Sequence, residues 1–134
     1  MSGMSLDSPR GLRRILVVDD QPALLKTLAT ILESAGFQVF TAGSGREAGL
    51  IASEHQIDLL ITDLGMPDED GIELVRRLKK EHRELKIIAM SGTFGPDLLK
   101  IAKHLGANAT LSKPMTATGL LDCVRKVDVD TDPS

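Results

Sequence analysis

The sequence predicts an α/β domain in which five parallel strands form a sheet with helices on both faces. Five short apolar segments alternate with five segments of helical periodicity, as in a series of βα units joined by right-handed crossovers. The expected strands are Ile15–Asp19, Phe37–Ala42, Ile57–Thr62, Lys86–Met90 and Ala109–Leu111. The first, third and fourth are nearly continuous apolar runs, which is typical of parallel strands covered on both faces. At 134 residues the chain is long enough to bury one core of this kind.

Start and stop signals place the first two helices between these strands. Pro22 suits the first turn of a helix, because an N–H at that position would have no intrahelical partner. An apolar stripe follows it and ends before Gly36, a common stop signal. The second helix is expected to open at Ser44, which is separated from Glu47 by the spacing of a capping box.

Apolar periodicity indicates three more helices. The third has an apolar inner face made of Ile72, Val75 and Leu78. Its outer face is basic and is made of Arg76, Arg77, Lys79 and Lys80. The fourth helix is expected over Pro96–Leu105, with Gly106 as its stop, and the fifth over Thr116–Val127.

Composition and charge narrow the function classes. The net charge of −3 gives no electrostatic reason to expect nucleic acid or an anionic membrane as a partner. The single cysteine, Cys123, permits neither an internal disulfide nor a cysteine metal cluster, which suits a reducing cytosol. No apolar run approaches the roughly 18 residues of a membrane span, and the N-terminus has no signal-peptide pattern. We therefore expect a cytoplasmic protein.

The two ends of the chain differ in composition from the rest. Residues 1–12 mix serine, glycine and proline without periodicity, and residues 128–134 are polar. We expect a flexible leader and a polar tail around one domain at residues 13–127. The sequence leaves open whether this domain is a protein on its own or part of a longer one.

Polar residues follow four of the expected strands. Asp19 and Asp20 end the first strand, Asp63 the third, Ser91 the fourth and Lys113 the fifth. In an open parallel sheet, ligands bind beside the carboxyl ends of the strands, where the strand order reverses. If the order is 2-1-3-4-5, the first and third strands are neighbours about 4.8 Å apart, and the three carboxylates share one crevice.

Three carboxylates in one crevice need a counter-charge. Mg²⁺ is a hard cation that prefers oxygen ligands, takes few carboxylates and keeps several waters. Lys113 is long enough to reach the crevice, and Ser91 offers a hydroxyl group. A metal ion, an ammonium group and a hydroxyl around one carboxylate form a clamp suited to a phosphoryl group in transfer. Each residue alone would be an ordinary cap or turn residue. Their convergence at one end of the sheet favours the chemical interpretation.

With these residues in place, the chain resembles the receiver domain of two-component response regulators over nearly all of residues 13–127. The matching motifs are ILVVDD at 15–20, DLGMPDEDG at 63–71, IIAMSG at 87–92 and GANATLSKP at 106–114. The resemblance implies the flavodoxin-like strand order 2-1-3-4-5. It also implies a signalling domain rather than a turnover enzyme. The phosphoryl donor would be a sensor histidine kinase or a histidine phosphotransfer protein, and the downstream effector is not identified.

The resemblance further implies roles for the acidic residues. Asp63 would attack a histidine-bound phosphoryl group and become an aspartyl phosphate. Mg²⁺ would be held directly by Asp20 and Asp63, by the backbone carbonyl of Gly65, and through water by Asp19. Because Gly65 places no side chain over Asp63, we expect water to reach the aspartyl phosphate readily.

The cation and the switch residues complete the expected site. Lys113 would pair with the phosphoryl oxygens, and the family's Lys–Pro bond at this position is typically cis. Ser91 would move toward the phosphoryl group as a switch. Receivers usually have an aromatic residue on the fifth strand, where this chain has Thr110. We therefore expect the conformational change on activation to occur mainly in the loop at residues 92–95. Phe94, just after Ser91 in this loop, is the nearest candidate to replace the missing aromatic residue.

Three other functions match the sequence less well. Gly43, Gly45 and Ala48 follow a strand, open a helix and precede Asp63 by about 20 residues, as in a dinucleotide-binding fingerprint. This interpretation is weaker, because a capping box explains the same turn and the other strand-end residues are left without a role. An aspartyl-nucleophile phosphatase needs a second acid two residues after its nucleophile, and Gly65 occupies that position. A docking module that is not phosphorylated is disfavoured by the intact acidic and lysine residues.

Overall fold

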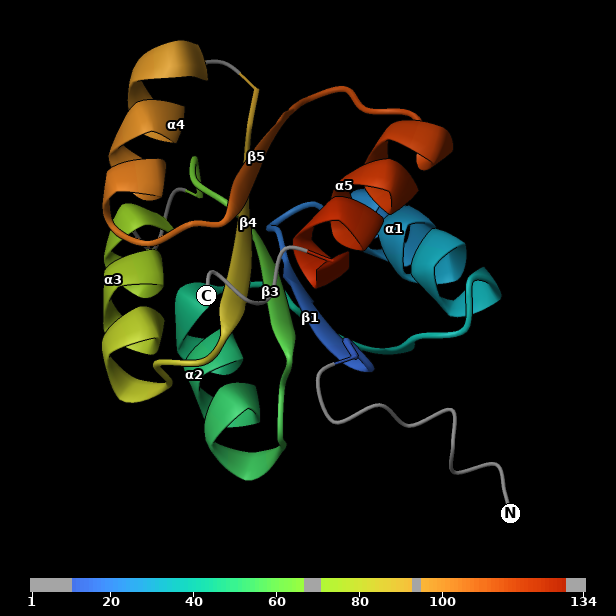
Figure 1. The fold of residues 1–134 in the computed structure, drawn as a ribbon, viewed down its shortest axis with the longest axis horizontal. Helices are drawn as coiled ribbons and strands as arrows, with labels where there is room; N and C mark the ends of the chain where they lie inside the picture. Colours follow the sequence, from blue (N-terminus) through green and yellow to red (C-terminus); the bar gives the residue numbers. More distant parts are fainter. Residues whose placement is uncertain (1–10, 67–70, 93–94, 130–134) are drawn as a thin grey trace.

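A five-stranded parallel sheet forms the centre of the domain (Figure 1). The structure, a computed structural model, describes residues 11–66, 71–92 and 95–129. The strands are β1 (Arg14–Val18), β2 (Gln38–Ala42), β3 (Leu59–Asp63), β4 (Lys86–Ser91) and β5 (Ala109–Ser112). They pair in the order β2-β1-β3-β4-β5, which confirms the predicted fold class and strand order.

Helices cover both faces of this sheet. They are α1 (Pro22–Ser34), α2 (Gly45–Glu54), α3 (Gly71–Glu81), α4 (Gly95–His104) and α5 (Ala117–Val129). Figure 1 shows α1 and α5 on one face and α2, α3 and α4 on the other. Within the described residues, no helix combines the length and apolar character that a membrane crossing requires.

Two apolar layers fill the space between the sheet and its helices. Alternate residues of a strand point to opposite faces. Thus Ile15 and Val17 of β1 pack in the cluster shared with α1 and α5, and Leu16 and Val18 pack in the cluster shared with α2, α3 and α4. All four side chains are fully buried. Burial on both faces explains why the strand is a continuous apolar run.

The helices begin and end close to the expected signals. Pro22 is the first residue of α1. Ser44 caps α2, because its Oγ accepts the N–H of Glu47 at 3.1 Å. Gly36 and Gly106 follow α1 and α4 with φ angles of 101° and 121°, a region in which glycine is not hindered.

Three strands reach one residue further than the apolar pattern predicted, into a polar terminal residue, and the third of them, β5, ends at Ser112. β3 includes Asp63 and β4 includes Ser91. Asp63 is the register partner of Met90, and the N–H of Leu64 donates to the carbonyl of Met90 at 2.9 Å. The sheet itself therefore fixes the backbone from which these polar side chains project.

The ends of the described chain meet at the opposite edge of the sheet. Leu12 is buried, and its N–H donates to Oδ1 of Asp128 at 3.1 Å. α5 continues to Val129, two residues beyond the expected end of the helix. Most of the expected leader (1–10) and tail (130–134), together with Phe94, lies outside the described residues.

Candidate functional site

The ends of β1 and β3 bring two carboxylates together. The strands pair with Val18 opposite Thr62, so Asp19 and Asp63 come next at the carboxyl edge of the sheet. Asp19 is fully buried, Asp63 is 6% exposed, and Asp20 is exposed. One carboxylate oxygen from each of the three lies within 4.8 Å of the other two. The expected acidic cluster is therefore present.

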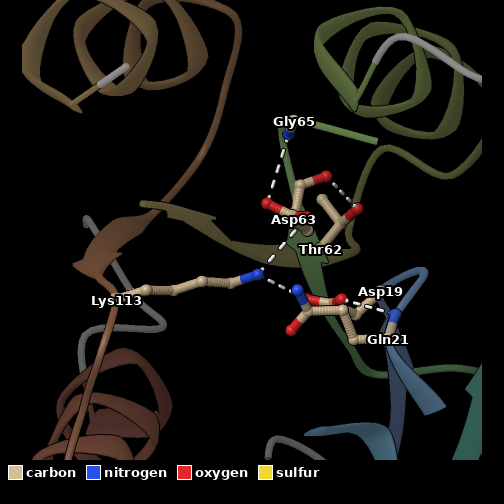
Figure 2. Close-up of polar contacts among 6 residues, drawn as sticks. All are labelled: Asp19, Gln21, Thr62, Asp63, Gly65 and Lys113. Carbon is tan, nitrogen blue, oxygen red and sulfur yellow. Dashed lines mark hydrogen bonds and ion pairs between the residues drawn. The ribbon is translucent and has the colours of Figure 1, made fainter. Parts of the chain in front are cut away.

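The side chain of Lys113 reaches across the sheet to this cluster (Figure 2). Its Nζ lies 2.6 Å from Oδ2 of Asp19 and 3.3 Å from Oδ2 of Asp63. Burial opposes the charge of Lys113, but the hydrogen bond to Asp19 and the negative charges of Asp63 and Asp19 outweigh burial. The pKa of Lys113 is therefore raised above its ordinary value of 10.5. The Lys113–Pro114 peptide bond is cis, as the resemblance implied.

Backbone N–H groups orient the two carboxylates that face Lys113 (Figure 2). Oδ1 of Asp19 accepts the N–H of Gln21 at 2.9 Å. Oδ1 of Asp63 accepts the N–H of Gly65 at 3.2 Å. In each carboxylate, one oxygen is held by the backbone and the other faces the ammonium group. Both side chains are thus fixed before any ligand arrives.

Two glycines shape the surroundings of Asp63. A Cβ atom added at Gly71, the first residue of α3, would lie 2.5 Å from the carbonyl oxygen of Asp63 and 2.5 Å from Cα of Leu64. Only glycine allows this approach between the helix and the end of β3. A Cβ atom added at Gly65 would lie 3.9 Å from Oδ1 of Asp63, so a side chain there would stand beside the carboxylate.

Sequence reasoning did not identify Gly71 as a residue of the site. The feature that could have revealed it is a glycine at the first position of a predicted helix, since glycine has a low helix propensity and is retained where another backbone comes close. The backbone N–H of Gln21 was also missed, because no side-chain pattern reveals an N–H that binds a carboxylate two residues earlier.

The two expected switch residues lie on adjacent strands. Ser91 ends β4 and is 2% exposed, and its carbonyl accepts the N–H of Lys113 at 2.9 Å. Thr110 is partly buried on β5 opposite Ala89, two residues before Ser112, which is the register partner of Ser91. Thr110 therefore lies further from the carboxyl edge of the sheet than Ser91.

The glycines of the possible dinucleotide fingerprint have structural roles. The N–H of Gly43 donates to Oε1 of Glu47 at 2.8 Å, within the cap of α2. Gly45 and Ala48 are buried, and the carbonyl of Gly45 accepts Nη2 of Arg77 from α3 at 3.3 Å. Helix capping and contact between α2 and α3 account for these small residues without a bound nucleotide.

Several known proteins are similar to this chain in sequence and fold. Residues 15–125 match the response regulator receiver domain family. The chain is 32% identical over 113 residues to sporulation initiation phosphotransferase F of Bacillus subtilis strain 168, which covers 84% of this chain and 91% of that protein. A crystal structure of a response regulator receiver domain protein from Clostridium thermocellum has a TM-score of 0.83 and 33% identity, and 88% of this chain and 95% of that chain are covered.

Some relatives are much longer than this chain. The virulence transcriptional regulatory protein PhoP of Salmonella typhimurium is 36% identical over 102 residues, which are 75% of this chain but only 45% of that protein. The chain therefore spans about half of that regulator.

The site and the relatives lead to the same family. The acidic triad of Asp19, Asp20 and Asp63 is typical of the Mg²⁺ site of receivers, and Lys113 lies against it. Receivers work with histidine kinases or phosphotransferases in two-component phosphorelays, as signalling domains rather than turnover enzymes. The chain belongs to the response regulator receiver domain family and is a phosphoacceptor receiver.

Proposed function

We propose that Asp63 is the phosphoacceptor and that Asp19, Asp20 and Lys113 prepare it for the reaction. The observation that supports this most directly is the position of Lys113 Nζ between Oδ2 of Asp19 and Oδ2 of Asp63. Asp63 is 6% exposed and lies at the edge of the sheet where ligands of this fold bind. Asp19 is fully buried and is less suited to meet a phosphoryl donor.

The reaction is a phosphoryl transfer from the phosphohistidine of a partner. A carboxylate oxygen of Asp63 forms a bond to phosphorus while the bond between phosphorus and the imidazole nitrogen breaks. The electron pair of that bond leaves with the imidazole, and the product is an aspartyl phosphate. Lys113 stays close to the phosphoryl oxygens, on which negative charge is concentrated during the transfer. The N–H of Gly65 holds the carboxylate of Asp63 in position.

The cluster fits Mg²⁺ as the cation of this site. The three side-chain donors of the cluster are carboxylate oxygens, which match a hard divalent cation better than a soft one. Asp20 and Asp63 would bind the ion directly together with the backbone carbonyl of Gly65, and Asp19 through water. Bound Mg²⁺ would supply positive charge for the oxygens of the incoming phosphoryl group.

The response to phosphorylation would begin at Ser91. Its hydroxyl group would hydrogen-bond a phosphoryl oxygen, and the loop that follows β4 would move with it. Thr110 has no aromatic ring that could change position on β5 and so alter the surface near α5. We therefore expect the loop at residues 92–95 to change conformation more than the surface of α5 does.

Partners and location follow from this assignment. The phosphoryl donor would be a sensor histidine kinase or a histidine phosphotransfer protein in the cytoplasm, and the phosphorylated receiver domain at residues 13–127 would bind a downstream effector. The similarity to a sporulation phosphotransferase supports a phosphorelay role of this type. We expect no direct contact of this domain with nucleic acid or membrane, since the net charge of −3 does not attract either polyanion.

Phosphorylation by acetyl phosphate and Mg²⁺ tests the assignment. Intact-mass measurement should show one added phosphate that hydroxylamine removes, and Asp63→Asn should abolish it. A base-stable phosphate on Ser91 would refute the assignment. Gly65→Asn provides a second test, since its side chain would stand beside Asp63 and should slow hydrolysis of the aspartyl phosphate. Unchanged hydrolysis in this variant would contradict the expected effect of an open Gly65.

A further inference from the structure

A basic hollow lies on the side of the domain away from Asp63. It has a volume of about 520 Å³ and is lined by Arg76, Lys79, Lys80, Arg83 and Leu105. Four of these residues belong to the end of α3 and the turn after it, and Leu105 follows α4. Figure 1 shows that α3 and α4 cover the same face of the sheet. Because helices in this fold run antiparallel to the strands, the hollow lies toward the amino edge of the sheet.

The hollow contains more positive charge than its surroundings balance. Among the residues that the structure describes, none that lines the hollow is acidic. Arg76 is paired with Glu73 at 2.8 Å, and Nζ of Lys79 donates to the carbonyl of Leu85 at 2.8 Å. Within the described part of the chain, Lys80 and Arg83 are exposed and have no hydrogen-bond or ion-pair partner. At least two cations of the hollow therefore face solvent outside any ion pair of the described residues.

Lys79 is held in the hollow by close packing. A Cβ atom added at Gly106 would lie 3.0 Å from Cγ of Lys79, so the glycine leaves room for the lysine stem. Burial, and the nearby charge of Lys86, lower the pKa of Lys79 below its ordinary value of 10.5. An anion bound in the hollow would offset the repulsion between the positive charges of Lys79 and Lys86.

Helix electrostatics explain only part of this cluster. Cations in the last turn of a helix interact favourably with its dipole, which accounts for Lys79 and Lys80. The helix dipole does not account for Arg76 or Arg83. Arg76 lies more than one turn before the end of α3 and Arg83 lies after that end, yet both line the same hollow. A larger groove of about 1000 Å³ shares Lys79 and Arg83, but its lining also contains the acidic residues Glu54, Asp58 and Glu84, so the surplus of positive charge is confined to the smaller hollow.

We propose that the basic hollow is a docking site for a short acidic segment of a partner protein. Guanidinium and ammonium groups pair with carboxylates, and Leu105 gives the hollow an apolar contact that a peptide side chain can use. Nucleic acid is a poorer match, because a long polyanion would also meet the rest of a chain whose net charge is −3. A docking site here is separate from the phosphoacceptor site, so a partner could bind while Asp63 receives its phosphoryl group.

Amide NMR titration with a defined acidic peptide tests the proposal. The probe is the synthetic peptide EELEELLEELEE, added to the intact chain at low ionic strength. The largest shifts should fall on residues 76–83 and on Leu105. The double variant Lys80→Glu/Arg83→Glu should weaken binding by about tenfold, since two modest surface attractions become repulsions. Both positions are exposed, so the variant should keep the amide spectrum of the folded domain.

A charge-matched variant separates local from overall charge. Lys26→Glu/Lys126→Glu changes two exposed lysines on α1 and α5 and should alter peptide affinity by less than about twofold, because distant surface charges are screened. Equal weakening by both double variants would overturn the proposal. Tighter binding of oligothymidylate than of the peptide, lost in Lys80→Glu/Arg83→Glu, would also overturn it by identifying a nucleic-acid site.

Discussion

Substitution of Gly71 by alanine tests how closely α3 must approach the phosphoacceptor strand. The added Cβ atom would lie 2.5 Å from the carbonyl oxygen of Asp63 and from Cα of Leu64, about 1 Å short of an ordinary contact. Both neighbours are backbone atoms, so they cannot rotate away. Either the start of α3 or the end of β3 must move, and the second movement displaces Asp63.

The matched control is Gly49→Ala in α2. There the new Cβ atom would lie 3.0 Å from Nη2 of Arg77, the far end of a flexible side chain. Alanine is favoured over glycine inside a helix by about 1 kcal/mol. Overpacking against fixed atoms costs about 1–3 kcal/mol. Gly49→Ala should therefore be neutral or stabilising, whereas Gly71→Ala should lower the free energy of unfolding by about 1–2 kcal/mol.

Urea and thermal unfolding followed by circular dichroism measure this difference. A gap of about 2 kcal/mol between the variants corresponds to about 7 °C in melting temperature for a chain of this size. Gly71→Ala should also slow phosphorylation by acetyl phosphate, because a shift of about 1 Å in a reacting group can reduce its rate about a hundredfold. If Gly71→Ala matched Gly49→Ala in both stability and phosphorylation rate, the close approach of α3 would have no functional importance.

Three other perturbations test the site. Asp20→Asn should weaken Mg²⁺ binding by about tenfold or more in an amide NMR titration, because a direct carboxylate ligand is lost; equal affinity would place the metal elsewhere. NMR titration should give Lys113 a pKa above 10.5, and Asp19→Asn should lower it, because burial remains while the largest favourable partner is lost; an unchanged value would contradict the pairing. The stability from this raised pKa should be fully present below pH 10.5 and lost as pH rises through the folded-state value. Beryllofluoride should shift the amides of residues 91–100 more than those of 116–127, since β5 has no aromatic residue; equal shifts would refute the proposed readout.

The strands were predictable because burial on two faces leaves a direct mark on the sequence. Ile15–Val18 has no polar residue and is fully buried. The polar residue that follows such a run must lie at the edge of the sheet. Asp19 and Asp63 could be placed side by side only with the strand order 2-1-3-4-5, which the family resemblance implied and the structure confirms. Strand ends were less predictable: backbone pairing carries β4 as far as Ser91, a residue that the apolar pattern excluded.

The contacts that prepare the site could not be predicted in the same way. The approach of Gly71 to Asp63 depends on the path of the chain between β3 and α3, and not on the type of either residue. Likewise, the sequence did not reveal that Lys113 pairs with Asp19 at 2.6 Å and with Asp63 at 3.3 Å. These are distances between residues far apart in the chain, and only the folded arrangement determines them.

The pairing of Lys113 gives the site a charge balance that is consistent with its proposed chemistry. Three carboxylates and one ammonium group lie together, so their formal charges leave two negative charges uncompensated. One divalent cation would neutralise that remainder. Asp20, the exposed member of the triad, has no cation of the described chain within ion-pair distance, and so it offers the least obstructed carboxylate for a metal from solvent. A phosphoryl group that then reaches Asp63 would meet a nearly neutral pocket in place of three unscreened carboxylates, and the repulsion that opposes transfer would be reduced.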